Sequence, residues 1–160
     1  MKVFVVIVTF NRIELLKRSI ESVRANQPFG IIVINNGSTD GTKEWLDSQP
    51  DLIVIHQKNV GGSGGFYTGI KHAYNMGADW IWCMDDDVFP RADCLKNLLD
   101  NATDKNIGIL APRRIMDGKI FCHDFQGYNL TRPFKSMYRQ RLVNEQVTSP
   151  TFIAGTAFEG

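Results

Sequence analysis

Trp80-Ile81-Trp82-Cys83-Met84-Asp85-Asp86-Asp87 is the segment around which the rest of the chain is organised. Five apolar residues run directly into three carboxylates. The apolar run is too short to form an independent helix and predicts a buried strand. Because adjacent acids repel one another, we expect a cation at the end of this strand, and Mg²⁺ or Mn²⁺ suits such oxygen ligands. The alternative is a solvated acidic turn before a helix that has Pro90 in its first turn.

Strands and helices are expected to alternate along residues 3–101. This alternation predicts an α/β fold with a mostly parallel sheet and helices on both faces. Asn11 and Glu14 resemble a capping pair for the first helix, and Trp45 and Leu46 are expected to point inward from a short second helix. The expected strands are residues 3–8, 31–34, 52–55, 80–84 and 107–110.

Polar or glycine-rich stretches follow each of the first four expected strands: Thr9–Arg12, Asn35–Asp40, Asn59–Gly65 and Asp85–Asp87. In a parallel sheet the carboxyl ends of the strands share one edge, and ligands bind beyond that edge. The sequence therefore predicts a site for a nucleotide-shaped ligand, with a metal ion at its phosphate end.

The segment from Gly61 to Gly65 contains four glycines in five residues. We expect a loop whose backbone approaches an anionic ligand at the start of the next helix. It is not a P-loop, because no Gly-Lys-Ser/Thr follows, and Tyr67 stands where the dinucleotide fingerprint needs its third glycine. A flexible surface turn is the alternative.

Four motifs in this order resemble the inverting family 2 glycosyltransferases of the GT-A fold. They are Thr9-Phe10-Asn11-Arg12, Asn36-Gly37-Ser38-Thr39-Asp40-Gly41, Asn59-Val60-Gly61-Gly62 and the triple aspartate. Gly61-Gly62-Ser63-Gly64-Gly65-Phe66 and the triple aspartate look most like bacterial galactofuranosyltransferases, with rhamnosyltransferases second. The resemblance is strong to about residue 112 and weak beyond it.

The resemblance implies a role for each matching residue. Asn35 or Asn36 stands where the family commonly has an aspartate that bonds the base, so the base preference is open. The remaining implied roles are donor uridine or diphosphate contacts for Thr9 and Arg12, a diphosphate-sugar lining from Asn59 and the backbone of Gly61, Gly62 and Gly64, a ribose or sugar contact for Asp86, and metal ligation by Asp85 and Asp87.

The implied reaction is metal-assisted transfer of a sugar, with inversion, from a UDP-sugar or dTDP-sugar donor to a glycan or lipid-linked acceptor. The catalytic base is expected beyond residue 160, and His123, Asp124 and Glu159 do not match its position. We therefore expect residues 1–160 to form a single nucleotide-sugar-binding domain that is incomplete at its C-terminus. Such a chain should bind donor and metal weakly at best and transfer little or no sugar alone.

Composition and charge restrict the class of protein. The chain of 160 residues is 43% hydrophobic and 22% charged, and its net charge of +1 gives no footprint for nucleic acid. Three cysteines without a Cys-x-x-Cys pair fit a reducing, cytoplasmic setting. No transmembrane segment is expected, and peripheral association with the inner face of the cell membrane is left open. Residues 121–150 mix aromatic and basic side chains, which indicates either an acceptor-binding or membrane-facing segment or a solvated irregular excursion.

Other classes of protein compete with this interpretation. Haloacid-dehalogenase-type phosphatases also place Asp-x-Asp at a strand end, but Val88-Phe89 does not fit their continuation. A nucleotidyltransferase would need its glycines after the first strand, and Thr9–Arg12 has none. A non-catalytic nucleotide-sugar-binding fragment is the more serious alternative, because it differs from the main hypothesis only in turnover.

Overall fold

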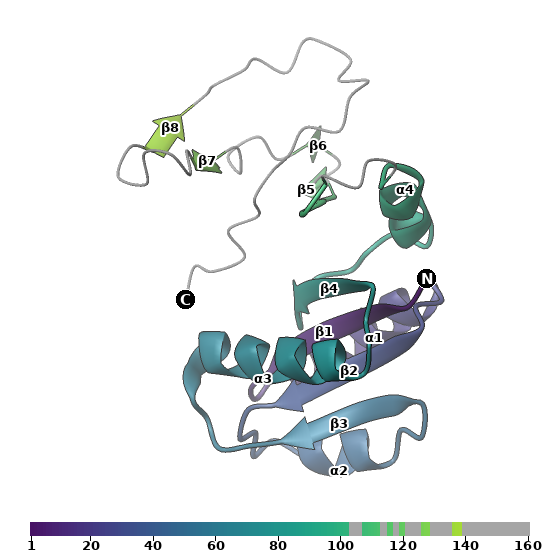
Figure 1. Cartoon of the computed structure of the whole chain (residues 1–160). Helices are drawn as coiled ribbons and strands as arrows, with labels where there is room; N and C mark the ends of the chain where they lie inside the picture. The colour runs from purple at the N-terminus through teal and green to yellow at the C-terminus, as the bar shows by residue number, and fades with distance from the viewer. Residues whose placement is uncertain (103–106, 113–114, 117–118, 121–125, 129–135, 139–160) are drawn as a thin grey trace. The chain divides into compact units, whose positions relative to one another are not determined.

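The computed structural model describes residues 1–102, 107–112, 115–116, 119–120, 126–128 and 136–138 (Figure 1). The chain divides into two compact units, residues 1–93 and residues 94–159, and each is described by itself. The first unit alternates strands and helices in the order β1 (Val3–Thr9), α1 (Ile13–Arg24), β2 (Gly30–Asn35), α2 (Thr42–Asp47), β3 (Leu52–His56), α3 (Gly61–Asn75) and β4 (Trp80–Asp85).

The four strands of the first unit form one parallel sheet in the order β3-β2-β1-β4. The register pairs Thr9 with Asn35 and Asn35 with His56, while Val8 pairs with Asp85. The order in which successive strands are added to the sheet reverses beside β1, because β2 and β3 lie on one side of it and β4 lies on the other. Ligands of open α/β sheets bind beside such a switch point.

Helices cover both faces of the sheet, as the sequence predicts (Figure 1). Successive side chains of a strand point to opposite faces, so each strand supplies two sets of core residues. One face packs against α1 and α2 through a cluster that includes Val5, Ile7, Leu16 and Leu46. The other face packs against α3 through a cluster that includes Phe4, Val6, Ile32, Ile34 and Phe66.

Two glycines of α3 let this helix lie close to the sheet. A Cβ atom added at Gly65 would lie 2.5 Å from Val8 Cγ1, and one at Gly69 would lie 2.3 Å from Val6 Cγ1. Both distances are shorter than atoms can approach without displacement. The glycines therefore fit the helix to the sheet, a role that we did not predict for this segment.

The second unit contains α4 (Cys94–Asp100) and two antiparallel strand pairs. Ile115 pairs with Ile120 and Met116 pairs with Lys119, while residues 117–118 between the two strands lie outside the described residues. The remaining bounds are β5 (Ile115–Met116), β6 (Lys119–Ile120), β7 (Gln126–Tyr128) and β8 (Ser136–Tyr138).

Several local predictions were wrong. Helix α3 begins at Gly61, so the glycines form its first turn and not a loop before it. The N-cap residue of α1 is Arg12, not Asn11, and its side chain makes no capping bond; Asn11 has a positive φ of 53° and bonds another loop. Helix α4 begins at Cys94, which leaves Pro90 outside it, and residues 107–110 are not in a strand. Leu46 is buried and Trp45 is partly buried against the same core, as expected.

Candidate donor-binding site

Side-chain alternation places a row of polar residues at the carboxyl edge of the sheet. Thr9, Asn35 and His56 follow Ile7, Val33 and Val54 by two positions, so they lie on the face covered by α1 and α2. Asp86 follows Met84 in the same way. The row is therefore built by four different strands, and the strand register brings it together.

Asp86 is the centre of the first half of this row. Its side chain is almost fully buried, and Thr9 Oγ1 donates a hydrogen bond of 2.7 Å to Asp86 Oδ2. Arg12 Nη1 donates to Asp86 Oδ1 at 3.4 Å and to Asp87 Oδ2 at 3.0 Å. The structure thus brings together Thr9, Arg12, Asp86 and Asp87, which the sequence placed in one site.

Burial raises the pKa of Asp86, and the neighbouring charge of Asp87 adds to this effect, while Thr9 and Arg12 oppose it. A buried carboxylate beside further carboxylates costs free energy unless positive charge lies nearby. The Arg12 side chain is 53% exposed, so water screens much of its attraction. Arg12 therefore offsets the negative charge at the end of β4 only in part.

The carboxylate oxygens at the end of β4 are suitable ligands for a hard divalent cation. Asp85 is exposed and Asp87 is half-exposed, so carboxylate oxygens are accessible at the end of β4. Within the part of the chain that the structure describes, no three His, Cys, Asp or Glu side chains converge as a metal-binding group. An ion held by one or two carboxylates takes its other ligands from water and substrate phosphate, which is usual for Mg²⁺.

The loops after β1 and β2 are tied to each other. Asn11 Oδ1 accepts a hydrogen bond of 2.7 Å from the Thr39 backbone N–H, and Ser38 Oγ accepts one of 3.0 Å from the Asn11 N–H. Asp40 accepts from the backbone N–H of Ile13 at the start of α1 and also from Thr42 at the start of α2. One carboxylate therefore joins the N-termini of two helices.

Asn36 faces α3 and is occupied by structural bonds. Its amide nitrogen donates to Asn59 Oδ1 and to the Gly61 carbonyl, and its oxygen accepts from Gln57 Nε2 and the Val60 N–H. These four bonds use the full capacity of the amide. Asn59 Oδ1 also accepts from the Gly61 N–H. The arrangement fixes the start of α3, where added Cβ atoms at Gly61 and Gly62 would meet nothing within 4 Å, whereas one at Gly64 would meet Val60 at 2.6 Å.

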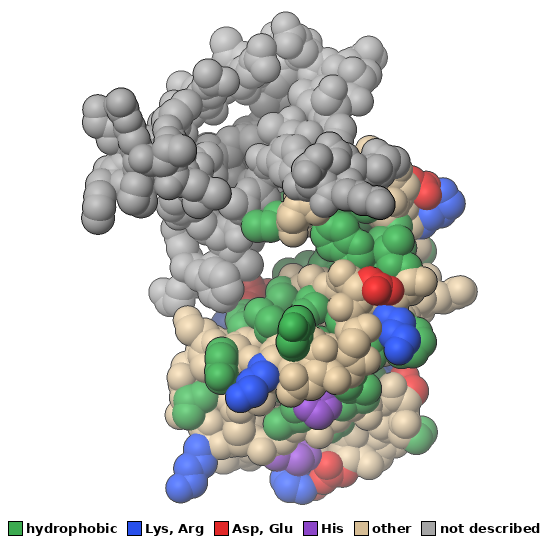
Figure 2. Space-filling model, viewed as in Figure 1, with side chains coloured by type: hydrophobic (Ala, Val, Ile, Leu, Met, Phe, Trp, Pro, Cys, Tyr) green, Lys and Arg blue, Asp and Glu red, His purple; other side chains and the backbone are tan. Residues whose placement is uncertain are grey.

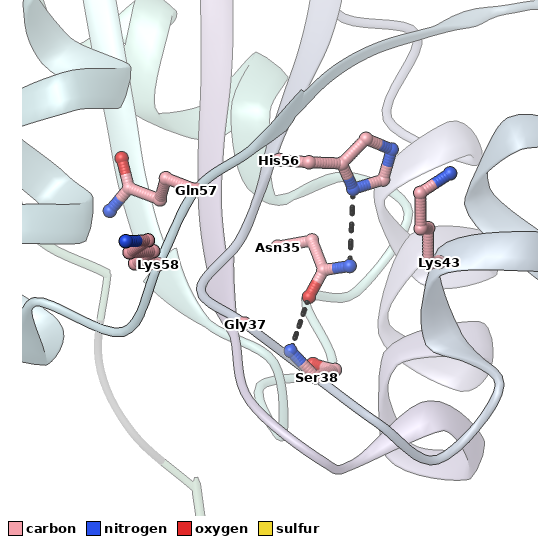
Figure 3. Close-up of a pocket in the computed structure, with 7 residues that line it drawn as sticks. All are labelled: Asn35, Gly37, Ser38, Lys43, His56, Gln57 and Lys58. Carbon is pink, nitrogen blue, oxygen red and sulfur yellow. Dashed lines mark hydrogen bonds between the residues drawn. The ribbon is translucent and has the colours of Figure 1, made fainter.

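Asn35 is buried at the base of an open hollow of about 370 Å³ (Figure 3). Figure 3 shows its amide between the backbone nitrogen of Ser38 and the ring of His56. The hollow is formed by the loop after β2, the end of β3 and one side chain of α2. Its lining residues are Asn35, Gly37, Ser38, Lys43, His56, Gln57 and Lys58.

Several residues of this edge were missed by sequence reasoning. The motifs of the sequence assign no role to His56, Lys43, Gln57 or Lys58. The signal that could have found them is the strand register, which places His56 beside Asn35. His123, Asp124, Glu159 and most of residues 121–150 lie outside the described residues.

The fold and the acidic strand end define a class of protein: the chain has the GT-A fold, the α/β Rossmann-like fold of nucleotide-sugar-dependent glycosyltransferases. The mannosyltransferase PcManGT from Pyrobaculum calidifontis, solved in complex with GDP-Man and Mn²⁺, has this arrangement. It superimposes with a TM-score of 0.57 at 22% identity, over 71% of this chain and 36% of that chain. Staphylococcus aureus TarS gives a TM-score of 0.53 at 20% identity, over 62% of this chain and 19% of that one.

The family model "Glycosyl transferase family 2" matches residues 4–157, and the chain belongs to this family. Galactofuranosyltransferase GlfT1 of Mycolicibacterium smegmatis is 36% identical over 112 residues, which are 67% of this chain and 37% of that protein. An undecaprenyl-phosphate mannosyltransferase of Micrococcus luteus is 29% identical over 75% of this chain and 51% of its own length. The chain therefore spans about a third to a half of these relatives. The prediction of family and fold from the sequence is confirmed.

Proposed function

We propose that this chain forms the donor-binding part of an inverting, metal-assisted glycosyltransferase that uses a UDP-sugar or dTDP-sugar. The proposal is carried by the contacts that join the ends of β1 and β4, where Thr9 and Arg12 bond Asp86 and Asp87. We call these four residues the acidic edge. Family membership supports the reaction class. Galactofuranose is the first candidate sugar and rhamnose the second, since GlfT1 relatives are galactofuranosyltransferases.

The spacing across the sheet supports a nucleoside diphosphate as the ligand. Neighbouring strands lie about 4.8 Å apart, so the ends of β2 and β4, which flank β1, are separated by about 10 Å. An extended nucleoside diphosphate spans a comparable length from its base to its second phosphate. We place the base in the hollow beside Asn35 and the diphosphate at the end of β4.

With the nucleotide placed in this way, the residues at the carboxyl edge of the sheet have distinct roles. Asn35 bonds the base, because Asn36 has no hydrogen-bonding capacity left. Arg12 supplies positive charge to the diphosphate, and the first turn of α3, with Gly61 and Gly62 open to solvent, presents backbone N–H groups to it. Asp86 bonds the ribose or the sugar.

Asp85 and Asp87 would hold a divalent ion, Mn²⁺ or Mg²⁺. When bound, such an ion neutralises the negative charge that a departing nucleoside diphosphate develops. The Asp87 carboxylate and the Arg12 guanidinium lie side by side. In this proposal the carboxylate binds the metal ion and the guanidinium binds the diphosphate of the sugar donor. The base that activates the acceptor hydroxyl is not among the residues that we assign.

The acceptor we propose is a glycan or a lipid-linked saccharide, which the undecaprenyl-phosphate relative supports. We further propose a cytoplasmic location with peripheral association at the membrane. Within the described residues, no helix is long and apolar enough to cross a membrane. On this proposal the enzyme would meet a lipid-linked acceptor at the membrane surface.

Calorimetric titration of UDP with and without Mn²⁺ tests the proposal. We expect Mn²⁺-dependent binding that is lost in an Asp85→Asn/Asp87→Asn double variant. An Asp51→Asn variant is the matched control, because it also removes an exposed carboxylate but lies just before β3, at the opposite edge of the sheet. Binding of dTDP without UDP would favour rhamnosyl donors, and failure to bind either nucleotide would contradict the proposed site.

Binding without turnover is the second candidate function. The chain spans 37% of the GlfT1 relative, so donor binding by these residues and turnover by a whole enzyme are separate proposals. Incubation with a radiolabelled UDP-galactofuranose donor and a lipid-linked acceptor separates the two functions. We expect Mn²⁺-dependent UDP binding and little or no transfer, and appreciable turnover would contradict this expectation.

A further inference from the structure

A backbone N–H group orients the Asn35 amide beside His56. The Ser38 N–H is a donor and nothing else, and it lies 3.0 Å from Asn35 Oδ1. This bond orients the amide, so that the oxygen of Asn35 faces Ser38 and the nitrogen faces His56 (Figure 3). The orientation of the amide therefore follows from the loop after β2.

The oriented Asn35 amide determines which ring nitrogen of His56 carries the proton. Asn35 Nδ2 is 3.1 Å from His56 Nδ1, and an amide nitrogen can only donate. Nδ1 must therefore be the unprotonated, accepting nitrogen. A neutral imidazole then carries its proton on Nε2.

The partner of Nε2 agrees with this assignment. His56 Nε2 lies 2.8 Å from Asp47 Oδ1, and Lys43 donates to the other oxygen, Asp47 Oδ2, at 2.6 Å. Hydrogen bonds from Lys43 and from His56 lower the pKa of Asp47, so this carboxylate is ionised and accepts at neutral pH. Every donor in the chain from Lys43 to Ser38 thus meets an acceptor.

The two hydrogen bonds of the Asn35 amide leave one donor and one acceptor of this amide for a ligand. One N–H and one lone pair of the oxygen remain after the bonds to His56 and Ser38. Their order is fixed, because reversing the amide would place donor against donor at Ser38. An imide edge, such as that of uracil or thymine, offers an N–H beside a carbonyl oxygen and complements this pair.

We propose that His56, held by Asp47, is a positioning residue that selects the nucleotide base by fixing the Asn35 amide in this hollow. The inference rests on the proposed function, since it takes the hollow as the base site. It goes further by assigning base selection to a relay that begins on α2. Protonation of Nδ1 would oppose the Asn35 N–H groups and break the relay. The charged groups near His56 are Asp47 and Lys43 on α2, together with Lys58 after β3.

The first test reads the tautomer and needs no ligand. Nitrogen-15 spectra of histidine-labelled protein at pH 7.5, with the His56 signals assigned from a His56→Gln variant, should show protonated Nε2 and unprotonated Nδ1. A proton on Nδ1 would overturn the inference. This result is independent of whether the chain binds any nucleotide, so it separates the inference from the proposed function.

The second test uses two matched variants and calorimetry with UDP and Mn²⁺. His56→Asn keeps an acceptor near the position of Nδ1, whereas His56→Gln keeps a donor toward Asp47 and removes that acceptor. Loss of a hydrogen bond between neutral groups corresponds to about fivefold in affinity. We expect about fivefold weaker UDP binding for His56→Gln and a change of less than about twofold for His56→Asn.

Inorganic pyrophosphate with Mn²⁺ is the control ligand, because it has no base. Neither variant should change its affinity. Equal UDP affinity in His56→Gln and the parent chain would overturn the inference, as would a parallel loss of pyrophosphate binding. If neither UDP nor dTDP binds the parent chain, the proposed function fails, while the tautomer is still decided by the spectra.

Discussion

Replacement of Gly69 by alanine should destabilise the fold, although alanine is the better helix former. The new Cβ would lie 2.3 Å from Val6 Cγ1 and 3.3 Å from Ile34 Cγ1, both in the buried core of the sheet. Extra atoms in a packed core cost about 1–3 kcal/mol. The change from glycine to alanine inside a helix returns up to about 1 kcal/mol.

Gly62→Ala in the same helix supplies the control, since its Cβ would meet nothing within 4 Å. We expect it to be unchanged or more stable by about 0.5 kcal/mol. Urea unfolding followed by circular dichroism should therefore place Gly69→Ala about 1–3 kcal/mol below Gly62→Ala, or about 1 M lower in midpoint. Equal midpoints for the two variants would refute the claim that close packing of α3 requires this glycine.

Three further predictions concern other buried or bonded groups. Asp40→Ala removes a carboxylate that joins the starts of two helices and should lower the free energy of unfolding by about 1 kcal/mol at pH 7. Burial opposes ionisation of Asp40, but its hydrogen bonds outweigh this effect and hold its pKa below 3.8. The urea midpoints of the variant and the parent should therefore converge as the pH falls through the lowered pKa. Thr9→Val should cost about 1–3 kcal/mol in urea unfolding because Asp86 loses a buried donor, while Thr9→Ser should be close to the parent. Burial raises the pKa of Cys83 to about 11, so in a chain with the other cysteines replaced by serine, Ellman's reagent at pH 8 should react much faster after denaturation than before.

The sheet could be predicted because its signals are local. Val3–Thr9 and Trp80–Asp85 are continuous apolar runs, and such runs indicate strands that are covered on both faces. The polar residues after each strand then had to meet at one edge of a parallel sheet. Asp86, Thr9 and Arg12 do so, with contacts between groups 74 to 77 residues apart.

The rest depended on information that no local pattern carries. Four glycines indicate close approach, but the partner of Gly65 is Val8 of the sheet, and only the packed structure shows it. Likewise, His56 gains a role only when the register places it beside Asn35. The apolar residues 107–110 resemble a strand in composition, yet no described strand pairs with them.

The position of β1 between β2 and β4 has a consequence for how the protein is made. On the ribosome, β1, β2 and β3 emerge in order and can pair with short connections. The other edge of β1 waits for β4, and closing that long loop carries a larger entropic cost. Thr9 and Asp86, separated by 77 residues, can meet only after this closure. The contacts of Thr9 and Arg12 with Asp86 and Asp87 are therefore the last part of the sheet edge to form, and in the nascent chain they stay unmade until the fourth strand has left the exit tunnel.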